Sequence, residues 1–187
     1  METENSTNQP SLLNHAIKFG SILAAISIVI TLLIYVIDWT IMARLGFIAI
    51  IMLVGIGYVI YAGINFRKAS GGFLPYGQAF VYCLAVLGVS GFISMIFHFL
   101  LYNVIDPELP QKLTEVIISN TEQMMTNFNT PQDKIDEKIA EMTEDLPNNF
   151  TTVGLILGYL KAYIGYVIIA LITALFARKN KPEATLS

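Results

Sequence analysis

The sequence predicts an all-α fold: an integral membrane four-transmembrane-helix bundle with an extracytoplasmic acidic helical hairpin between spans three and four. Three observations predict it. Of the 187 residues, 55% are hydrophobic and only 13% are charged, whereas about 25% of residues are charged in average soluble domains. Four apolar stretches are long enough to cross a bilayer, and one acidic segment separates the last two. The net charge of −3 argues against a nucleic-acid partner.

The four apolar stretches follow a polar N-terminal segment at residues 1–15. A membrane span needs about 20 apolar residues, because the hydrocarbon core is about 30 Å thick and a helix rises 1.5 Å per residue. The stretches that meet this requirement are 16–37, 45–66, 76–102 and 153–177. The first three spans thus occupy residues 16–102 and the fourth lies within 151–177. Each is expected to be helical, since lipid offers no partners for free backbone groups.

The basic residues near the spans predict the orientation of the chain. They lie mostly in the second loop and the C-terminal tail, at Arg67, Lys68, Arg178, Lys179 and Lys181. The first loop holds only Arg44, beside Asp38. We therefore expect a bacterial inner-membrane protein whose N-terminus and basic tail (178–187) are cytoplasmic, with the first span kept as a signal anchor. The inverted orientation is the alternative.

The segment 103–150 differs from the rest of the chain. Ten acidic residues and three lysines give it a net charge of −7. Apolar residues recur near every 3.6 positions in two stretches, which predicts two amphipathic helices. Thr130 and Pro131 are expected to begin the second helix, as N-cap and first helical residue, and Pro147 to end it. The hairpin's apolar stripe is expected to cover the outer mouth of the bundle; a docking surface for a cationic partner is the alternative.

Lys161 lies inside the fourth span, where a charged side chain is costly and is expected to face protein or water. It shares one helical face with three glycines, spaced at helical intervals along the span: Gly154, Gly158 and Gly165. Small residues let another helix approach closely. The sequence therefore predicts a helix-packing seam on this face, with the tyrosines of the span on the opposite one.

The third span offers polar groups at a similar depth, namely Ser90, Ser94 and His98. Asp38 is the nearest carboxylate expected for Lys161, and Asp106 and Glu108 are alternatives. Two interpretations follow: Lys161 is satisfied by local groups and fixes helix register, or Lys161 and His98 form a proton or substrate relay. The chain has only one cysteine and two histidines, and the two histidines are expected at opposite sides of the membrane. This argues against a metal site, which needs several such ligands close together.

One motif and the residues around it carry a resemblance to a known family. The motif Gly71-Gly72-Phe73-Leu74-Pro75-Tyr76-Gly77-Gln78-Ala79-Phe80 follows the basic pair Arg67 and Lys68, and Asp106-Pro107-Glu108 follows the third span. In these features the chain resembles small four-span bacterial membrane proteins that are grouped as a domain of unknown function and are common in Bacteroidetes. The resemblance covers nearly the whole chain. It implies a multi-pass membrane protein with a long loop before the last span, and it implies no activity.

The expected function is that of a non-enzymatic structural or accessory membrane subunit, without catalytic residues, cofactor or metal. The expected partners are the lipid bilayer and either a second copy of the chain or another membrane protein. The alternative is a small transporter or proton-coupled permease that uses Lys161 and His98.

Overall fold

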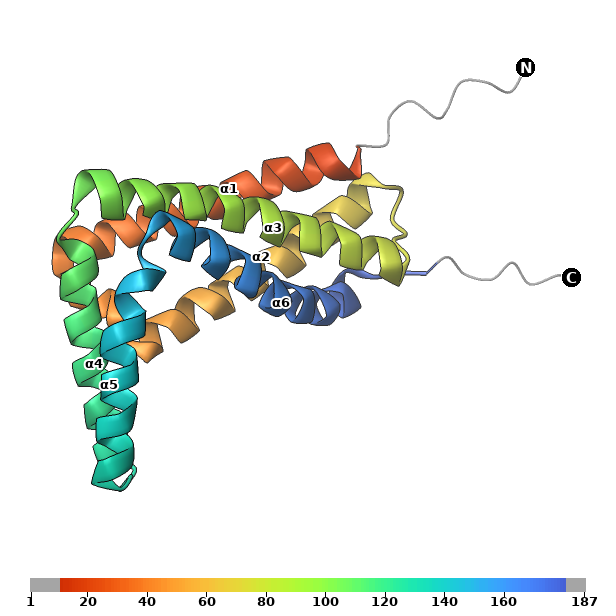
Figure 1. Cartoon of the computed structure of the whole chain (residues 1–187). Helices are drawn as coiled ribbons and strands as arrows, with labels where there is room; N and C mark the ends of the chain where they lie inside the picture. The colour runs from red at the N-terminus through yellow and green to blue at the C-terminus, as the bar shows by residue number, and fades with distance from the viewer. Residues whose placement is uncertain (1–10, 181–187) are drawn as a thin grey trace, which may run out of the picture. The chain divides into compact units, whose positions relative to one another are not determined.

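The computed structural model describes residues 11–180, which fold into six α-helices and two short helical turns (Figure 1). The elements are α1 (Leu12–Asp38), the 3-10 turn η1 (Trp39–Ala43), α2 (Leu45–Ala69), α3 (Tyr76–Leu100), the π turn η2 (Leu101–Ile105), α4 (Leu109–Asn127), α5 (Gln132–Asn149) and α6 (Thr152–Ala177). The fold is all-α, as predicted. Residues 1–10 and Lys181, parts of the predicted N-terminal segment and basic tail, lie outside the described residues.

Four helical stretches are long and apolar enough to cross a membrane, judged by length and composition. They are Leu12–Ala43, Leu45–Ala69, Tyr76–Ile105 and Thr152–Ala177. They match the four predicted spans and extend them by a few residues. These stretches, which hold most of the chain's apolar residues, indicate a membrane-embedded protein.

The segment between α3 and α6 forms a helical hairpin, which confirms the two predicted amphipathic helices. Two details differ from the prediction. Pro131 is the N-cap of α5 and Gln132 its first helical residue, one position later than expected. Pro147 lies inside α5 instead of ending it. A proline in the last turn removes only one backbone hydrogen bond, so the helix continues for two more residues.

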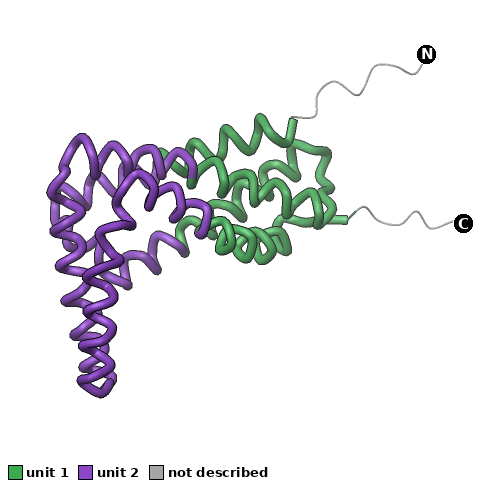
Figure 2. The backbone as a smooth tube through the Cα atoms, viewed as in Figure 1, with its two compact units in different colours: residues 1–25, 53–91, 162–187 green, residues 26–52, 92–161 purple. Residues whose placement is uncertain are grey.

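The described residues divide into two compact units, each made of pieces of several helices (Figure 2). Unit 1 takes its residues from Met1–Ala25, Leu53–Gly91 and Ala162–Ser187. Unit 2 comprises Ile26–Met52 and Phe92–Lys161. The unit boundaries fall within α1, α2, α3 and α6, so each of these helices contributes to both units.

Unit 1 has a core of small residues and aromatic rings. Tyr82 is fully buried, and its ring stacks on Phe66 with 4.4 Å between centroids. The helices approach closely at glycines: a Cβ built on Gly63 would lie 2.6 Å from the Ala177 Cβ. Such contacts leave no room for larger side chains.

The loop between α2 and α3 is bound to the C-terminal end of α6 in unit 1. Arg67 donates hydrogen bonds to the carbonyls of Ala177 (3.0 Å) and Arg178 (3.2 Å), which are free at a helix end. Leu74 and Lys179 pair their backbones in an isolated antiparallel bridge. Gly71 and Gly72 have φ values of +87° and +85°, which glycine adopts without steric cost.

Unit 2 has its own core around the base of the hairpin. Leu101, Leu109 and Leu113 are buried there, with Tyr35 and Trp39 packed against the cluster. The apolar stripe of α4 thus packs on the end of α1 and on η1. Further along the hairpin, Ile135 of α5 is 2% exposed.

Two polar contacts tie the hairpin to this base. The Tyr35 hydroxyl donates to Asp106 Oδ2 (3.1 Å), and the Asn120 amide donates to the Ala43 carbonyl (3.3 Å). Asp106 Oδ1 also accepts from the backbone N–H groups of Glu108 and Leu109 at the start of α4. Asp106 therefore anchors the hairpin and also binds the backbone at the start of α4.

Candidate functional site

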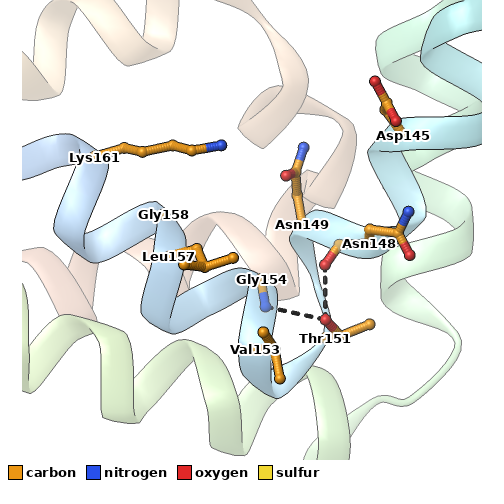
Figure 3. Close-up of a pocket in the computed structure, with 9 residues that line it drawn as sticks. All are labelled: Asp145, Asn148, Asn149, Thr151, Val153, Gly154, Leu157, Gly158 and Lys161. Carbon is orange, nitrogen blue, oxygen red and sulfur yellow. Dashed lines mark hydrogen bonds between the residues drawn. The ribbon is translucent and has the colours of Figure 1, made fainter.

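A polar pocket of about 630 Å³ lies in unit 2, where α5 ends and α6 begins (Figure 3). Its lining combines an acid, a lysine, amides and a hydroxyl with apolar side chains and glycines: Asp145, Asn148, Asn149, Thr151, Val153, Gly154, Leu157, Gly158 and Lys161. The pocket brings Lys161, the predicted intramembrane charge, to the same cavity as polar groups from the end of α5.

The turn between α5 and α6 shapes the pocket. Thr151 Oγ donates to the Asn148 carbonyl (2.7 Å) and accepts from the N–H of Gly154 (3.1 Å), which caps the start of α6. A Cβ on Gly154 would collide with the Asn148 carbonyl oxygen, so this tight turn requires glycine. Gly158, one turn further along, has no atom within 4 Å of a built Cβ, and it leaves the wall of the pocket open.

Lys161 reaches the pocket along its own helix. It lies nine residues after Thr152, about 13 Å along the helix axis. Side chains in a helix tilt toward its N-terminus, and Figure 3 shows Lys161 pointing along α6 toward Asn149, with Asp145 beyond. None of the four ion pairs among residues 11–180 includes Lys161.

The three carboxylates predicted as partners of Lys161 have other contacts. Asp38 accepts from the Thr40 hydroxyl (2.6 Å) and backbone N–H (3.0 Å) and lies 4.0 Å from Arg44. Asp106 anchors the hairpin, and Glu108 pairs with Lys112 at 3.1 Å. The predicted pairing of Asp38 with Lys161 is therefore wrong, because the turn that follows α1 supplies nearer partners. The carboxylate that shares the pocket with Lys161 is Asp145.

His98 does not line the pocket. Its Nδ1 lies 2.8 Å from the backbone carbonyl of Ser94, and since a carbonyl only accepts, Nδ1 carries the proton in this bond. Its ring packs against Phe97 and Tyr102, each with 5.5 Å between centroids. Ser94 thus contributes its carbonyl to His98, and Ser90 is buried in unit 1. These contacts do not assemble the predicted relay of Lys161 and His98.

The predicted glycine seam is also wrong for contacts within this chain. Gly154 and Gly158 line the pocket, and a Cβ on Gly165 would have no neighbour within 4 Å. In unit 1, α6 instead meets α3 through its tyrosines. A Cβ on Gly88 would lie 3.1 Å from the Tyr163 hydroxyl, and one on Gly91 would lie 2.5 Å from the Tyr166 hydroxyl. The small residues that permit close approach are on α3, because the large rings are on α6.

Four polar residues of the pocket were not predicted from the sequence: Asp145, Asn148, Asn149 and Thr151. Their signal was nevertheless present. They lie within seven residues directly before the fourth span, and the tilt of helical side chains directs Lys161 toward that end. Among residues 11–180, no group of three or more His, Cys, Asp or Glu residues is arranged to hold a metal ion.

Comparisons with known proteins place most of the chain in one family. A family model described as "Protein of unknown function (DUF4199)" matches residues 18–179. No curated protein matches the chain, and no solved structure matches it.

Proposed function

The chain belongs to the DUF4199 family of proteins of unknown function, and from this premise we propose that it is a non-catalytic accessory membrane protein. Its four spans hold an acidic helical hairpin outside the cytoplasm, where the hairpin binds a cationic region of another membrane protein. Both termini are cytoplasmic, and the membrane is a bacterial inner membrane.

The observation that carries this function is that the hairpin has far more acids than its own lysines neutralise. Its lysines pair with neighbours on the same helix, Lys112 with Glu108, Lys134 with Glu137 and Lys138 with Glu141. Seven of its ten acids take part in no ion pair among the described residues, and six of these are exposed: Glu115, Glu122, Asp133, Asp136, Glu144 and Asp145. Such a surface attracts a positively charged partner.

The orientation rests on the basic residues of unit 1. Arg67 binds the end of α6, so the second loop and the start of the tail lie together. Lys68, Arg178 and Lys179 belong to the same two segments. Basic residues favour the cytoplasmic side. The hairpin follows α3 and precedes α6, so it lies one crossing away from these segments, on the outer side.

Cysteine labelling tests the orientation, and the chain suits it because Cys83 is its only cysteine and is buried. In a Cys83→Ala background, Asp136→Cys is expected to react with an impermeant maleimide on intact cells. The matched variant Lys68→Cys is expected to react only after permeabilisation. The opposite pattern contradicts the orientation.

Charge neutralisation tests the accessory role. In native membranes, the wild-type hairpin is expected to crosslink to other membrane proteins. The triple variant Glu115→Gln, Glu122→Gln, Asp136→Asn is expected to give about tenfold less of these crosslinked products. The matched control replaces exposed neutral residues of the hairpin, Gln111, Ser119 and Gln123, with alanine and is expected to keep them. Equal crosslinking of the two variants, or crosslinking that is insensitive to salt, contradicts an electrostatic role.

The transporter alternative requires Lys161 and His98 in one cavity. The pocket contains Lys161 without His98, and the His98 ring is held by Ser94 of its own helix. These contacts support the accessory role over a relay of these two residues.

A further inference from the structure

We propose that the pocket between α5 and α6 binds the headgroup of an aminophospholipid, in which a phosphate is joined to a primary ammonium. The phosphate lies against Lys161 and the ammonium against Asp145. Of the exposed acids on the hairpin, the site uses only Asp145, and it holds for either orientation of the chain in the membrane.

Lys161 supplies the positive end of the site. Its ammonium has three donors and no acceptor, and it pairs with no carboxylate among the described residues. Inside an apolar span such a charge is costly without a counter-ion. A phosphate in the pocket provides that counter-ion, and the Asn149 amide, which lies between Lys161 and Asp145 in Figure 3, can donate to it as well.

Asp145 supplies the negative end. It is exposed on the last turns of α5 and lines the same pocket. Like Lys161, it belongs to none of the ion pairs among residues 11–180. A site with a cation at one end and a carboxylate at the other matches a zwitterionic headgroup better than a simple anion. A primary ammonium also donates hydrogen bonds to the carboxylate, which a trimethylated one cannot do.

The apolar wall favours a lipid over a soluble phosphate compound. Val153 and Leu157 line the pocket and are 64% and 48% exposed. Gly158 adds open space beside them. Both side chains belong to a helix long and apolar enough to cross the membrane, so acyl chains can cover them while the headgroup occupies the polar end. The volume of about 630 Å³ is in the usual range of ligand sites.

The test uses the purified full-length chain in detergent micelles and measures bound lipid by native mass spectrometry. The probes are dioleoyl phosphatidylethanolamine and dioleoyl phosphatidylcholine, which share acyl chains and phosphate. Wild-type protein is expected to retain the ethanolamine lipid about tenfold better than Lys161→Met does, because the variant loses one charge-assisted hydrogen bond to the phosphate. Lys161→Arg is expected to restore retention. The control Lys138→Met, an exposed lysine of α5 outside the pocket, is expected to behave as wild type.

Asp145→Asn tests the other end of the site at an exposed position. It is expected to keep the phospholipid and to lose the preference for ethanolamine over choline. If Lys161→Met retains each of the two lipids as well as the wild-type protein does, the proposal is overturned. Competition by soluble glycerophosphoethanolamine at the concentration of the lipid overturns the assignment to a membrane lipid. Because no partner protein is present, the result is independent of the proposed accessory function.

Discussion

Unit 1 and unit 2 are built on different packing principles. In unit 1, glycine and alanine let helices and aromatic rings approach closely, as at Gly63 against Ala177. In unit 2, amphipathic helices bury leucine and isoleucine and expose charge, and polar bonds such as Asn120 to Ala43 fix their base. In apolar surroundings, helix association depends on fit, because burying apolar surface gains little against lipid. In the hairpin, which faces water in the proposed orientation, burial itself stabilises the fold.

The largest effect is expected from Ile135→Ala. This side chain is 2% exposed, and Ile135 is the one buried residue of α5. Truncation of a buried isoleucine costs about 2–5 kcal/mol, so amide hydrogen exchange in α4 and α5 should accelerate strongly. Phe128→Ala, at a residue that is 78% exposed, should leave it unchanged. The reactivity of Cys83 in unit 1 should stay the same in both variants, and a parallel increase there would show that the units open together.

The next effect is expected from Gly63→Ala. The added methyl would lie 2.6 Å from the Ala177 Cβ, and neither group can rotate away. Overpacking of this kind costs about 1–3 kcal/mol. A cost of about 2 kcal/mol corresponds to an increase of about thirtyfold in the labelling rate of Cys83.

The matched control for this prediction lies on the same helix. Gly57 has no atom within 4 Å of a built Cβ, so Gly57→Ala should leave the Cys83 labelling rate unchanged or reduce it, since alanine favours the helix. Similar acceleration by the two variants would mean that close approach at Gly63 does not determine the stability of unit 1.

A smaller effect is expected from Asn120→Ala, which removes the hydrogen bond to the Ala43 carbonyl. Loss of one such bond costs about 1 kcal/mol, so hydrogen exchange should accelerate about fivefold in the turns of α4 around Asn120 and little at the tip of the hairpin. Asn127→Ala, at an exposed residue of the same helix, serves as the control. Uniform acceleration along the hairpin would contradict a local anchoring role.

The smallest effect concerns the ion pair of Lys112 with Glu108. The hydrogen bond to Glu108 raises the pKa of Lys112 above its usual value of 10.5. A raised lysine pKa stabilises the fold below the unfolded pKa, and this stabilisation is lost as the pH rises through the folded pKa. The contribution of Lys112 to the stability of the hairpin should therefore stay constant between about pH 7 and 9. In an NMR titration of the Lys112 Nζ, the wild-type protein should lose this proton at a higher pH than the Glu108→Gln variant does.

The sequence predicted the spans well because length and hydropathy decide them locally. It also predicted the hairpin, since an apolar period of 3.6 in a segment as polar as 103–150 is typical of amphipathic helices. It failed for the partners of polar side chains and for helix packing. Asp38 was matched with Lys161 as the nearest carboxylate, but its partners are Thr40 and Arg44, in the turn directly after α1. The glycines of α6 were expected to pack, whereas open space lies beside Gly158 and Gly165.

The sequence by itself therefore determined that this chain is helical, membrane-embedded and divided between an apolar part and an acidic hairpin, because hydropathy and charge are properties of single residues and their spacing. Only the tertiary structure decided which face of α6 packs against α3 and which carboxylate shares a cavity with Lys161. Both depend on helix rotation and on the turn at Thr151. Successive residues of a helix point in directions about 100° apart. In a span that is apolar on all sides, the hydropathy pattern therefore does not indicate which face packs against a neighbouring helix.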